Sequence, residues 1–205
     1  MEALLAQIRA CTACPGLPLG PKPILQASAS ARILIVGQAP GRITHAKGRP
    51  FDDPSGERLR AWLGVSRDVF YDPAMFAIIP MGFCFPGTGK GGDLPPRPEC
   101  APLWRPKLMA GLPKIGMTLV LGQYAHEWHL PGAKGLRLVD RVAAWRETWP
   151  DLVPLPHPSP RNQGWFARYP WFEAEVIPEL RMRVGQILAQ KEVLAQKRPD
   201  LPPPA

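Results

Sequence analysis

The sequence predicts an α/β fold in which helices cover both faces of a mostly parallel sheet. Four short apolar runs, at 32–36, 76–79, 118–121 and 152–155, are typical of strands that are buried on both faces. Segments with helical patterns separate these runs. Because strands joined by helical crossovers pair in parallel, the alternation favours one layered domain.

The predicted helices lie between and around these strands. They span residues 2–10, 56–63, 99–110, 123–129, 139–148 and 171–195. Ser55 is expected to cap the second helix, because a serine hydroxyl accepts hydrogen bonds from first-turn amides. Pro102 and Pro106 are expected to limit the third. The segments 37–55 and 82–97 are expected to be long loops.

Size and composition restrict the class of protein. A chain of 205 residues with 45% hydrophobic residues predicts a single domain over 1–198, followed by a flexible tail over 199–205. No run approaches the ~20 apolar residues of a membrane helix, and the N-terminal segment lacks the apolar core of a secretory signal. We therefore expect a cytoplasmic monomer without a membrane partner.

The net charge of +8 favours a polyanionic partner such as nucleic acid, although many cytosolic proteins are also basic. The glycine-rich segment 87–92 lacks the pattern of a phosphate-binding P-loop. Lys90 in this segment is expected to contact a phosphate backbone, or to lie in a solvated loop. His126 and His129, three residues apart on a predicted helix, are interpreted as structural or surface residues.

Four cysteines form a pattern that is typical of metal binding. Cys11 and Cys14 are spaced C-x2-C, and Cys84 and Cys100 follow after a long gap. In a reducing compartment such a set favours a metal site over disulfides. Ligation by four thiolates fits both tetrahedral zinc and a [4Fe–4S] cluster, and the spacing does not choose between them. The alternative is four unrelated buried cysteines.

Unusual loops follow three of the four predicted strands. They read GQAPG after the first strand, PMGFC after the second and HPSPRN after the fourth. Ligands of parallel sheets bind at the carboxyl ends of the strands. The sequence therefore predicts one site built from residues 37–56, 80–97 and 157–165.

Several residues in these loops carry candidate chemistry. Gly37 and Gly41 permit close backbone approach to a carbonyl oxygen or an anion, or form an ordinary turn. His157, held between prolines, suits a hydrogen-bond donor. Asp52 or Asp53 can orient a water molecule or cap the following helix. The aromatic residues Phe51, Phe83, Phe85 and Trp165 can stack on bases or pack in the core.

The ordered set GQAPG (37–41), GRPF (48–51), SG (55–56) and HPSPRN (157–162), with the four cysteines, resembles the uracil-DNA glycosylase superfamily and its iron–sulfur family-4 type. The resemblance runs from Cys11 to the last helix. It implies a four-stranded parallel sheet in a three-layer α/β/α sandwich. It also implies a structural [4Fe–4S] cluster on Cys11, Cys14, Cys84 and Cys100.

The implied activity is that of a monofunctional uracil-DNA glycosylase in base excision repair. Such an enzyme flips uracil out of single- or double-stranded DNA, hydrolyses its N-glycosidic bond and releases free uracil, leaving an abasic site. The catalytic residues would be His157, donating to uracil O2, with Gln38 and Asp53. The residues implied to contact the substrate are Gly37, Gln38, Ala39, Phe51, Gly82, Phe83, Arg161 and Asn162.

Two positions depart from the family pattern. Family-4 enzymes carry Glu where this chain has Gln38, and an amide cannot act as a base. The water would be oriented by Gln38 without proton abstraction, or by Asp52 or Asp53. Pro80 stands where the family reads uracil with Asn, so reading falls to backbone groups of 80–83 or to another side chain. The alternatives are a glycosylase for hypoxanthine or xanthine, and a non-catalytic iron–sulfur DNA-binding protein.

Overall fold

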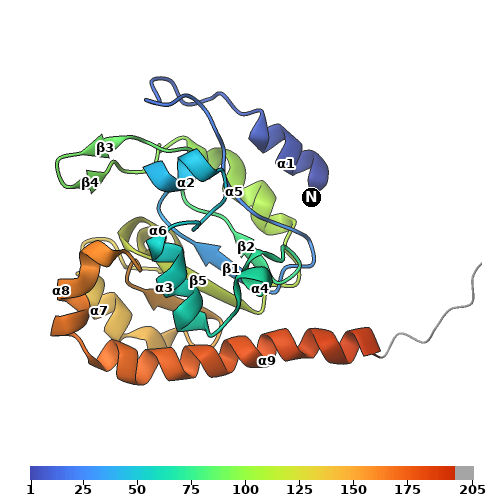
Figure 1. Ribbon diagram of the computed structural model, residues 1–205, viewed down its shortest axis with the longest axis vertical. Coiled ribbons are helices and arrows are strands. Elements are labelled where there is room, and N and C mark those ends of the chain that lie inside the picture. The colour runs from blue at the N-terminus through green and yellow to red at the C-terminus, as the bar shows by residue number, and fades with distance from the viewer. Residues whose placement is uncertain (197–205) are drawn as a thin grey trace, which may run out of the picture.

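A computed structural model describes residues 1–196, and the tail predicted over 199–205 lies outside them. The predicted fold class is confirmed, because a four-stranded parallel sheet forms the centre of the molecule (Figure 1). In spatial order the strands are β2 (Phe76–Ile78), β1 (Ile33–Val36), β5 (Met117–Leu121) and β6 (Leu152–Leu155).

The strand pairings show which strands are central in the sheet and which lie at its edge. Ile33 of β1 pairs with Phe76 on one side and with Met117 on the other, so β1 is hydrogen-bonded along both edges. Pro154 lies opposite Val120 on β6, which is an edge strand. A proline is tolerated there because an edge strand has one side without a ladder partner.

Alternate residues of β1 divide the core between the two faces of the sheet. Ile33 and Ile35 belong to one apolar cluster, while Leu34 and Val36 belong to the other. The first cluster includes residues of α3 (Pro54–Leu63) and α9 (Ile177–Gln196), and the second includes residues of α1 (Glu2–Arg9) and α5 (Cys100–Ala110). Burial of apolar surface on both faces produces the predicted three layers.

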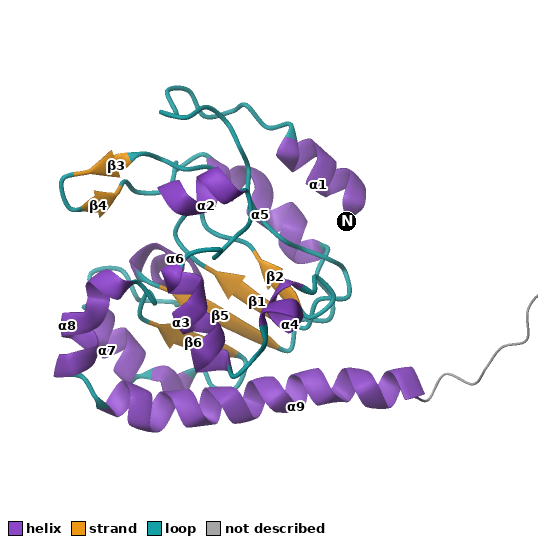
Figure 2. Cartoon of the chain, viewed as in Figure 1, coloured by secondary structure: helices purple, strands orange, loops and turns teal. Residues whose placement is uncertain are grey.

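The remaining elements are short and surround the sheet (Figure 2). They are α2 (Arg42–Lys47), α4 (Arg67–Tyr71), β3 (Thr88–Gly89), β4 (Gly92–Asp93), α6 (Gln123–His129), α7 (Leu138–Ala143) and α8 (Gln163–Arg168), with 3-10 turns at Trp145–Glu147 and Pro160–Asn162 and a π-helical turn at Phe172–Val176. No helix among residues 1–196 has the length and hydrophobicity needed to cross a bilayer.

The two segments predicted as long loops contain regular structure. The first contains α2, and the second contains the antiparallel β3–β4 hairpin. The hairpin turns on glycines, and Gly92 has a φ of 136°, which a side chain rarely adopts. The two-residue strands are too short for a hydrophobic alternation, so sequence periodicity could not reveal them.

The cap of α3 and the effect of the prolines in α5 also differ from the prediction. Asp53, not Ser55, caps α3, and its Oδ1 accepts a hydrogen bond from the Gly56 amide at 2.9 Å. The helix α5 continues through Pro102 and Pro106. Pro102 lies in the first turn, where backbone amides have no partner within the helix. Pro106 has no N–H to donate, so one hydrogen bond to the Pro102 carbonyl is missing and the helix continues.

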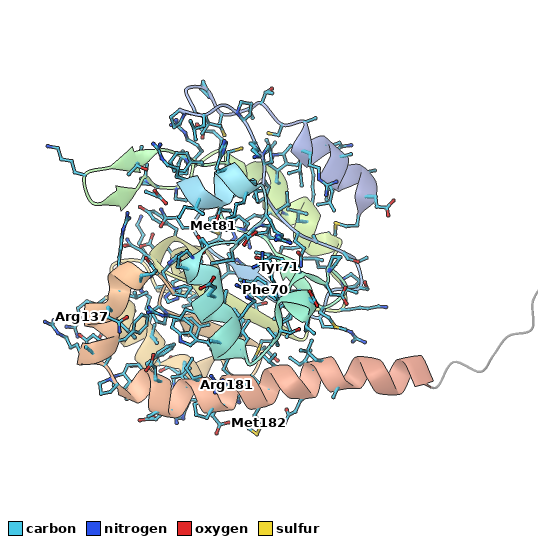
Figure 3. The ribbon with its side chains drawn as sticks, viewed as in Figure 1. Phe70, Tyr71, Met81, Arg137, Arg181 and Met182 are labelled. Carbon is cyan, nitrogen blue, oxygen red and sulfur yellow. The ribbon has the colours of Figure 1, made fainter. Side chains whose placement is uncertain are left out.

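Arg181 ties the longest helix to the helix that borders the site. Its Nη2 donates to the Ala61 carbonyl at 2.7 Å, and its Nε lies 3.3 Å from the Trp62 carbonyl. Figure 3 shows Arg181 at this junction between α9 and α3. Because the last carbonyls of a helix lack partners within it, the guanidinium satisfies them and fixes the C-terminal end of α3.

Candidate active site

A cavity of about 390 Å³ lies where the predicted site was expected, at the carboxyl ends of the strands. Its walls come from the GQAPG turn, α2, the start of α3, the β3–β4 hairpin and the HPSPRN loop. The predicted site residues that line it are Gly37, Gln38, Ala39, Phe51, Asp53, His157 and Arg161. Segments far apart in the sequence therefore meet at one site.

Three predicted substrate contacts lie elsewhere. Gly82 and Phe83 line a second cavity beside the cysteines, and the Phe83 side chain is buried in the core. The Asn162 side chain donates to the His157 carbonyl at 2.7 Å and so closes the HPSPRN loop. Of the four aromatic candidates, only Phe51 lines the larger cavity.

Phe51 is held in an unusual backbone conformation. Its φ is +52°, and it is the one non-glycine residue with positive φ in the described part of the chain. Its carbonyl accepts a hydrogen bond from Arg60 Nη1 at 3.3 Å. A Cβ on Gly56 would lie 1.7 Å from the same carbonyl oxygen, which explains the glycine of the SG pair. Such strain persists where the surrounding structure enforces it, often at functional sites.

The Phe51 ring covers the first glycine of the GQAPG turn. A Cβ on Gly37 would lie 3.4 Å from Phe51 Cζ, so a larger residue would crowd the ring. Amides of the next segment fix the turn, because Met81 N donates to the Gly37 carbonyl at 2.8 Å and Gly82 N to the Gln38 carbonyl at 2.9 Å. The ring and the turn thus form a rigid aromatic wall.

His157 faces this wall across the cavity. The centroids of the His157 and Phe51 rings are 6.4 Å apart, with 31° between the planes. Within residues 1–196 the half-buried imidazole has no hydrogen-bond partner, so its nitrogens are available to a ligand. Burial lowers the pKa of His157, while the nearby Asp53 and Asp93 carboxylates oppose this change. The imidazole is therefore neutral at pH 7.

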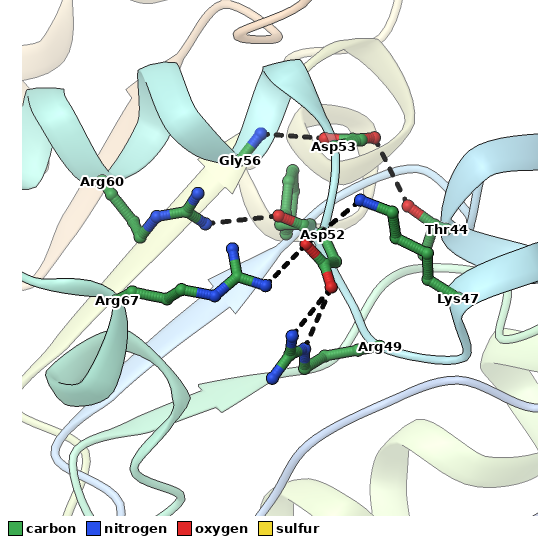
Figure 4. A network of polar contacts seen from close by, with 9 residues as sticks. Thr44, Lys47, Arg49, Asp52, Asp53, Gly56, Arg60 and Arg67 are labelled. Atoms are coloured by element: carbon green, nitrogen blue, oxygen red, sulfur yellow. Dashed lines mark hydrogen bonds and ion pairs between the residues drawn. The ribbon is translucent and has the colours of Figure 1, made fainter.

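The two adjacent aspartates have different surroundings (Figure 4). Besides capping α3, Asp53 accepts a hydrogen bond from Thr44 Oγ1 at 3.3 Å, so both carboxylate oxygens are engaged. Asp52 is outside the cavity lining and forms ion pairs with Lys47, Arg49 and Arg67. Hydrogen bonds from Arg67 and Arg49 hold the pKa of the Asp52 carboxyl far below its usual range.

Gln38, the position that departs from the family pattern, bonds to the hairpin. Its Nε2 donates to the Leu94 carbonyl at 2.9 Å. This contact brings the neighbouring Asp93 into the cavity lining, a functional candidate that the sequence analysis missed. A glycine pair before an aspartate indicates a turn, but turn chemistry alone does not place the carboxylate beside a distant motif.

Pro80 and the apolar Ile24 and Ile78 form part of the cavity wall. Behind them, the carbonyls of Ile79 and Pro80 accept hydrogen bonds from the buried Arg105 Nη1 at 3.1 and 3.3 Å. The amides of Met81 and Gly82 donate to the Gly37 and Gln38 carbonyls of the GQAPG turn, so these two amides are already engaged within the protein.

The two helix histidines are structural, as predicted. Nε2 of the buried His126 lies 3.0 Å from the carbonyls of Val120 and Leu155, at the ends of β5 and β6. Nε2 of His129 lies 2.6 Å from Arg105 Nη2. Burial lowers the pKa of His129 to about 4 and that of Arg105 to about 10, so a neutral imidazole accepts from a charged guanidinium at pH 7.

The second cavity, of about 20 Å³, gathers the cysteines. It is lined by Cys11, Cys14, Cys84 and Cys100. Burial raises the pKa of the Cys14 and Cys84 thiols, and raises that of Cys100 to about 12. Among residues 1–196 no three Cys, His, Asp or Glu side chains are grouped closely enough to hold a metal ion.

Two other side chains of this cavity bear on whether a sulfur-rich group fits there. Arg97 Nε and Trp104 Nε1 are buried donors without a hydrogen-bond partner in the described part of the chain. Unpaired buried donors are costly, whereas sulfide and thiolate sulfur of a cluster would accept from them. The unpaired donors and the four thiols have the chemistry that an anionic sulfur-rich group would need, while their present positions form no ligand cluster among the described residues.

The profile of the Uracil DNA glycosylase superfamily matches residues 26–181. The matched region contains all four strands of the sheet and the segments that form the larger cavity, and it begins after the first cysteine pair. The members of this superfamily are DNA glycosylases, which hydrolyse N-glycosidic bonds. With most of its length matched, the chain belongs to the uracil-DNA glycosylase superfamily.

Proposed function

We propose that the protein is a monofunctional uracil-DNA glycosylase that excises uracil from DNA and leaves an abasic site. One observation carries the proposal: the Phe51 ring, fixed over Gly37, faces the unpaired imidazole of His157 across a cavity. A flat base stacked on Phe51 would present its edge to His157. Stacking of a base on an aromatic ring contributes ~1–3 kcal/mol.

The charges that develop during excision explain the role of the histidine. When the N-glycosidic bond breaks, its electron pair leaves with the base and the sugar becomes positively charged. A neutral His157 can donate a hydrogen bond to uracil O2 as negative charge develops there. A preorganised donor of this kind typically lowers the barrier by ~2.7–4 kcal/mol.

The cations around the cavity suit a DNA strand. Arg42 and Arg161 line its mouth with exposed side chains, and exposed Lys90 lies at the tip of the hairpin. Arg161 follows His157 on the loop that would press into the minor groove. Phosphate contacts supply the sequence-independent part of DNA affinity, and flipping a base from the stack costs a few kcal/mol.

The direct test is excision of uracil from oligonucleotides, followed by alkali to break the strand at abasic sites. We expect strand breaks in single- or double-stranded DNA containing uracil, and none where thymine replaces it. Breakage that requires the alkali step would support a monofunctional enzyme. If neither substrate is broken, uracil excision is refuted.

Hypoxanthine or xanthine is the second candidate lesion. The observation that favours it is the apolar wall at Pro80 and Ile78, where the family's uracil-reading amide is missing. Excision assays with these bases at matched positions distinguish the candidates. Binding to each lesion without excision would instead support a non-catalytic DNA-binding protein.

We further propose that Cys11, Cys14, Cys84 and Cys100 hold a structural [4Fe–4S] cluster, as in the family-4 type. The shared cavity and its unpaired donors support this assignment. When bound, the cluster would cross-link the N-terminal segment to the start of α5 without taking part in hydrolysis. Burial raises the pKa of the Cys14, Cys84 and Cys100 thiols, and coordination to a metal centre would favour their ionised form.

Metal analysis of anaerobically purified protein tests the assignment. We expect about four iron and four sulfide per chain for one such cluster, and loss of both in Cys84→Ser. Cys84→Ser should also unfold at lower temperature, since the cross-link is lost. A stoichiometric content of zinc, with no iron, would contradict the cluster.

A further inference from the structure

The β3–β4 hairpin forms a wall of the cavity that joins its two main loops. At one end, Gln38 Nε2 of the GQAPG turn donates to the Leu94 carbonyl at 2.9 Å, and Leu94 N donates to the Gly87 carbonyl at 2.8 Å. At the other, a Cβ on Gly92 would lie 3.1 Å from Arg161 Nη1 of the HPSPRN loop. The hydrogen bond from Gln38 therefore holds the hairpin against the GQAPG turn, and the Arg161 side chain of the HPSPRN loop lies beside Gly92.

This arrangement sets the position of the Asp93 carboxylate. Its Oδ1 accepts a hydrogen bond from Thr88 Oγ1 across the hairpin at 3.3 Å. Its Oδ2 lies 3.0 Å from the place that a Cβ on Gly41 would occupy, so the carboxylate reaches the GQAPG turn. Asp93 also lines the cavity, and its negative charge acts to raise the pKa of His157, against the effect of burial.

Of the two carboxylates that line the cavity, Asp93 is the one with an oxygen that is free to bind a ligand or a water molecule. Both oxygens of Asp53 accept hydrogen bonds, and Asp52 lies in ion pairs outside the lining. Asp93 Oδ2, in contrast, has no hydrogen-bond partner among residues 1–196. Gln38, at the position where family-4 enzymes carry an acid, has no charge and is bonded to the hairpin.

We propose that Asp93 is a catalytic carboxylate of this enzyme, supplied by the hairpin in place of the acid missing at residue 38. The proposal rests on the glycosylase function proposed above. Asp93 would stabilise the positive charge that develops on the sugar and would orient the attacking water. Gln38 is then a positioning residue that holds the hairpin over the turn.

The chemical step balances with these groups. The bond between N1 of uracil and C1′ of the sugar breaks, and its electron pair stays on N1. The water oxygen forms a bond to C1′, and the proton that the water loses passes to the Asp93 carboxylate and then to solvent. The uracil anion, stabilised at O2 by His157, takes up a proton from solvent after the bond has broken.

Single-turnover excision measures the role of Asp93. Asp93→Asn keeps the shape and the acceptor for Thr88 but removes the charge, and we expect it to slow excision about a hundredfold, within the range for general bases. Asp93→Glu should recover part of the rate. Asp140→Asn removes a carboxylate from an exposed ion pair with Arg137 and should match the wild-type rate. An unchanged rate in Asp93→Asn would overturn the proposal.

A binding measurement tests Asp93 independently of the base that is excised. The probes are DNA duplexes that contain a cationic pyrrolidine or a neutral tetrahydrofuran abasic analogue. We expect the wild type to bind the cationic analogue at least tenfold more tightly, and Asp93→Asn to lose this preference. Unchanged affinity for the neutral analogue shows that the variant is folded and binds DNA.

The two measurements separate the failure of each proposal. Cation preference that depends on Asp93, without release of uracil, would refute uracil excision and support the role of the carboxylate. Release of uracil with a preference that survives in Asp93→Asn would refute that role alone. A wild type without any preference would also overturn it, because no group then stabilises the sugar cation.

Discussion

The two cavities both border one short segment, residues 80–84, and their linings differ in chemistry. Pro80 borders the larger cavity, whereas Gly82, Phe83 and Cys84 border the smaller. The larger is lined by side chains with unused hydrogen-bonding capacity, among them His157. The smaller is enclosed by thiols whose burial disfavours ionisation.

The comparison shows that one loop contributes residues to the linings of two different cavities. The chain bends at residues 81–84, so Pro80 lines the larger cavity while Gly82, Phe83 and Cys84 line the smaller one. The resemblance to the superfamily implied that Gly82 and Phe83 contact the substrate. Both residues line the cavity of the cysteines and are absent from the lining of the larger cavity.

The largest effect expected on the substrate side is that of His157→Ala. We expect excision to slow by a factor of 10²–10³, as for the loss of one preorganised donor, with little change in DNA affinity. Single-turnover rates and binding titrations measure the two quantities. Equal losses in rate and affinity would show that His157 only binds the DNA.

The pH dependence sharpens the same point. Burial lowers the pKa of His157, so the imidazole stays neutral down to a pH below its ordinary range near 6.5. Excision that needs the neutral donor should therefore persist as the pH falls through 6.5. A rate that falls with a midpoint at or above that value would contradict this state of the donor.

Gly56→Ala tests the wall itself. The added Cβ would collide with the Phe51 carbonyl at 1.7 Å, and we expect a loss of about 3 kcal/mol in unfolding free energy, at the upper end for overpacking. Gly185→Ala in α9 is the matched control, since nothing lies within 4 Å of its Cβ position. The control should be stabilised by ~0.5–1 kcal/mol. Denaturant titration measures both, and equal stabilities would contradict the backbone contact.

A smaller effect is expected for Asp52→Asn, outside both cavities. Asp52 is buried, but its cationic partners are half exposed, so we expect a loss of only about 1–2 kcal/mol. The folded-state pKa of Asp52 is depressed, so its stabilisation is complete above pH ~4 and is lost as the pH falls further. The stability difference between wild type and variant should shrink in acid. A difference that stays constant down to pH ~2 would exclude this linkage.

The sequence predicted the architecture well, because buried strands and carboxyl-end loops follow from local patterns. It placed β6 at its observed residues and brought Gly37, Phe51 and His157 to one site. It did not choose between Asp53 as a water-binding group and as a helix cap, because that choice depends on Thr44, a residue of another helix.

Asp93 shows why the rest could not be predicted. Its role depends on the hydrogen bond between Gln38 and Leu94, which are 56 residues apart. Neither the residue types nor their spacing in the sequence predicts such a contact. The strained backbone of Phe51 is similar, because a positive φ at phenylalanine is enforced by Arg60 and Gly56 against its local preference.

The buried Arg105 has a consequence for both cavities at once. Its guanidinium binds the carbonyls behind the Pro80 wall and interacts electrostatically with Cys100. An anionic sulfur centre held by Cys100 would thus have a buried cation nearby, bonded to the carbonyls of Ile79 and Pro80. The positive charge of Arg105 would offset the negative charge of the sulfur centre, which would otherwise repel the base as it leaves with negative charge. The base site and a site for an anionic group can therefore border the same segment.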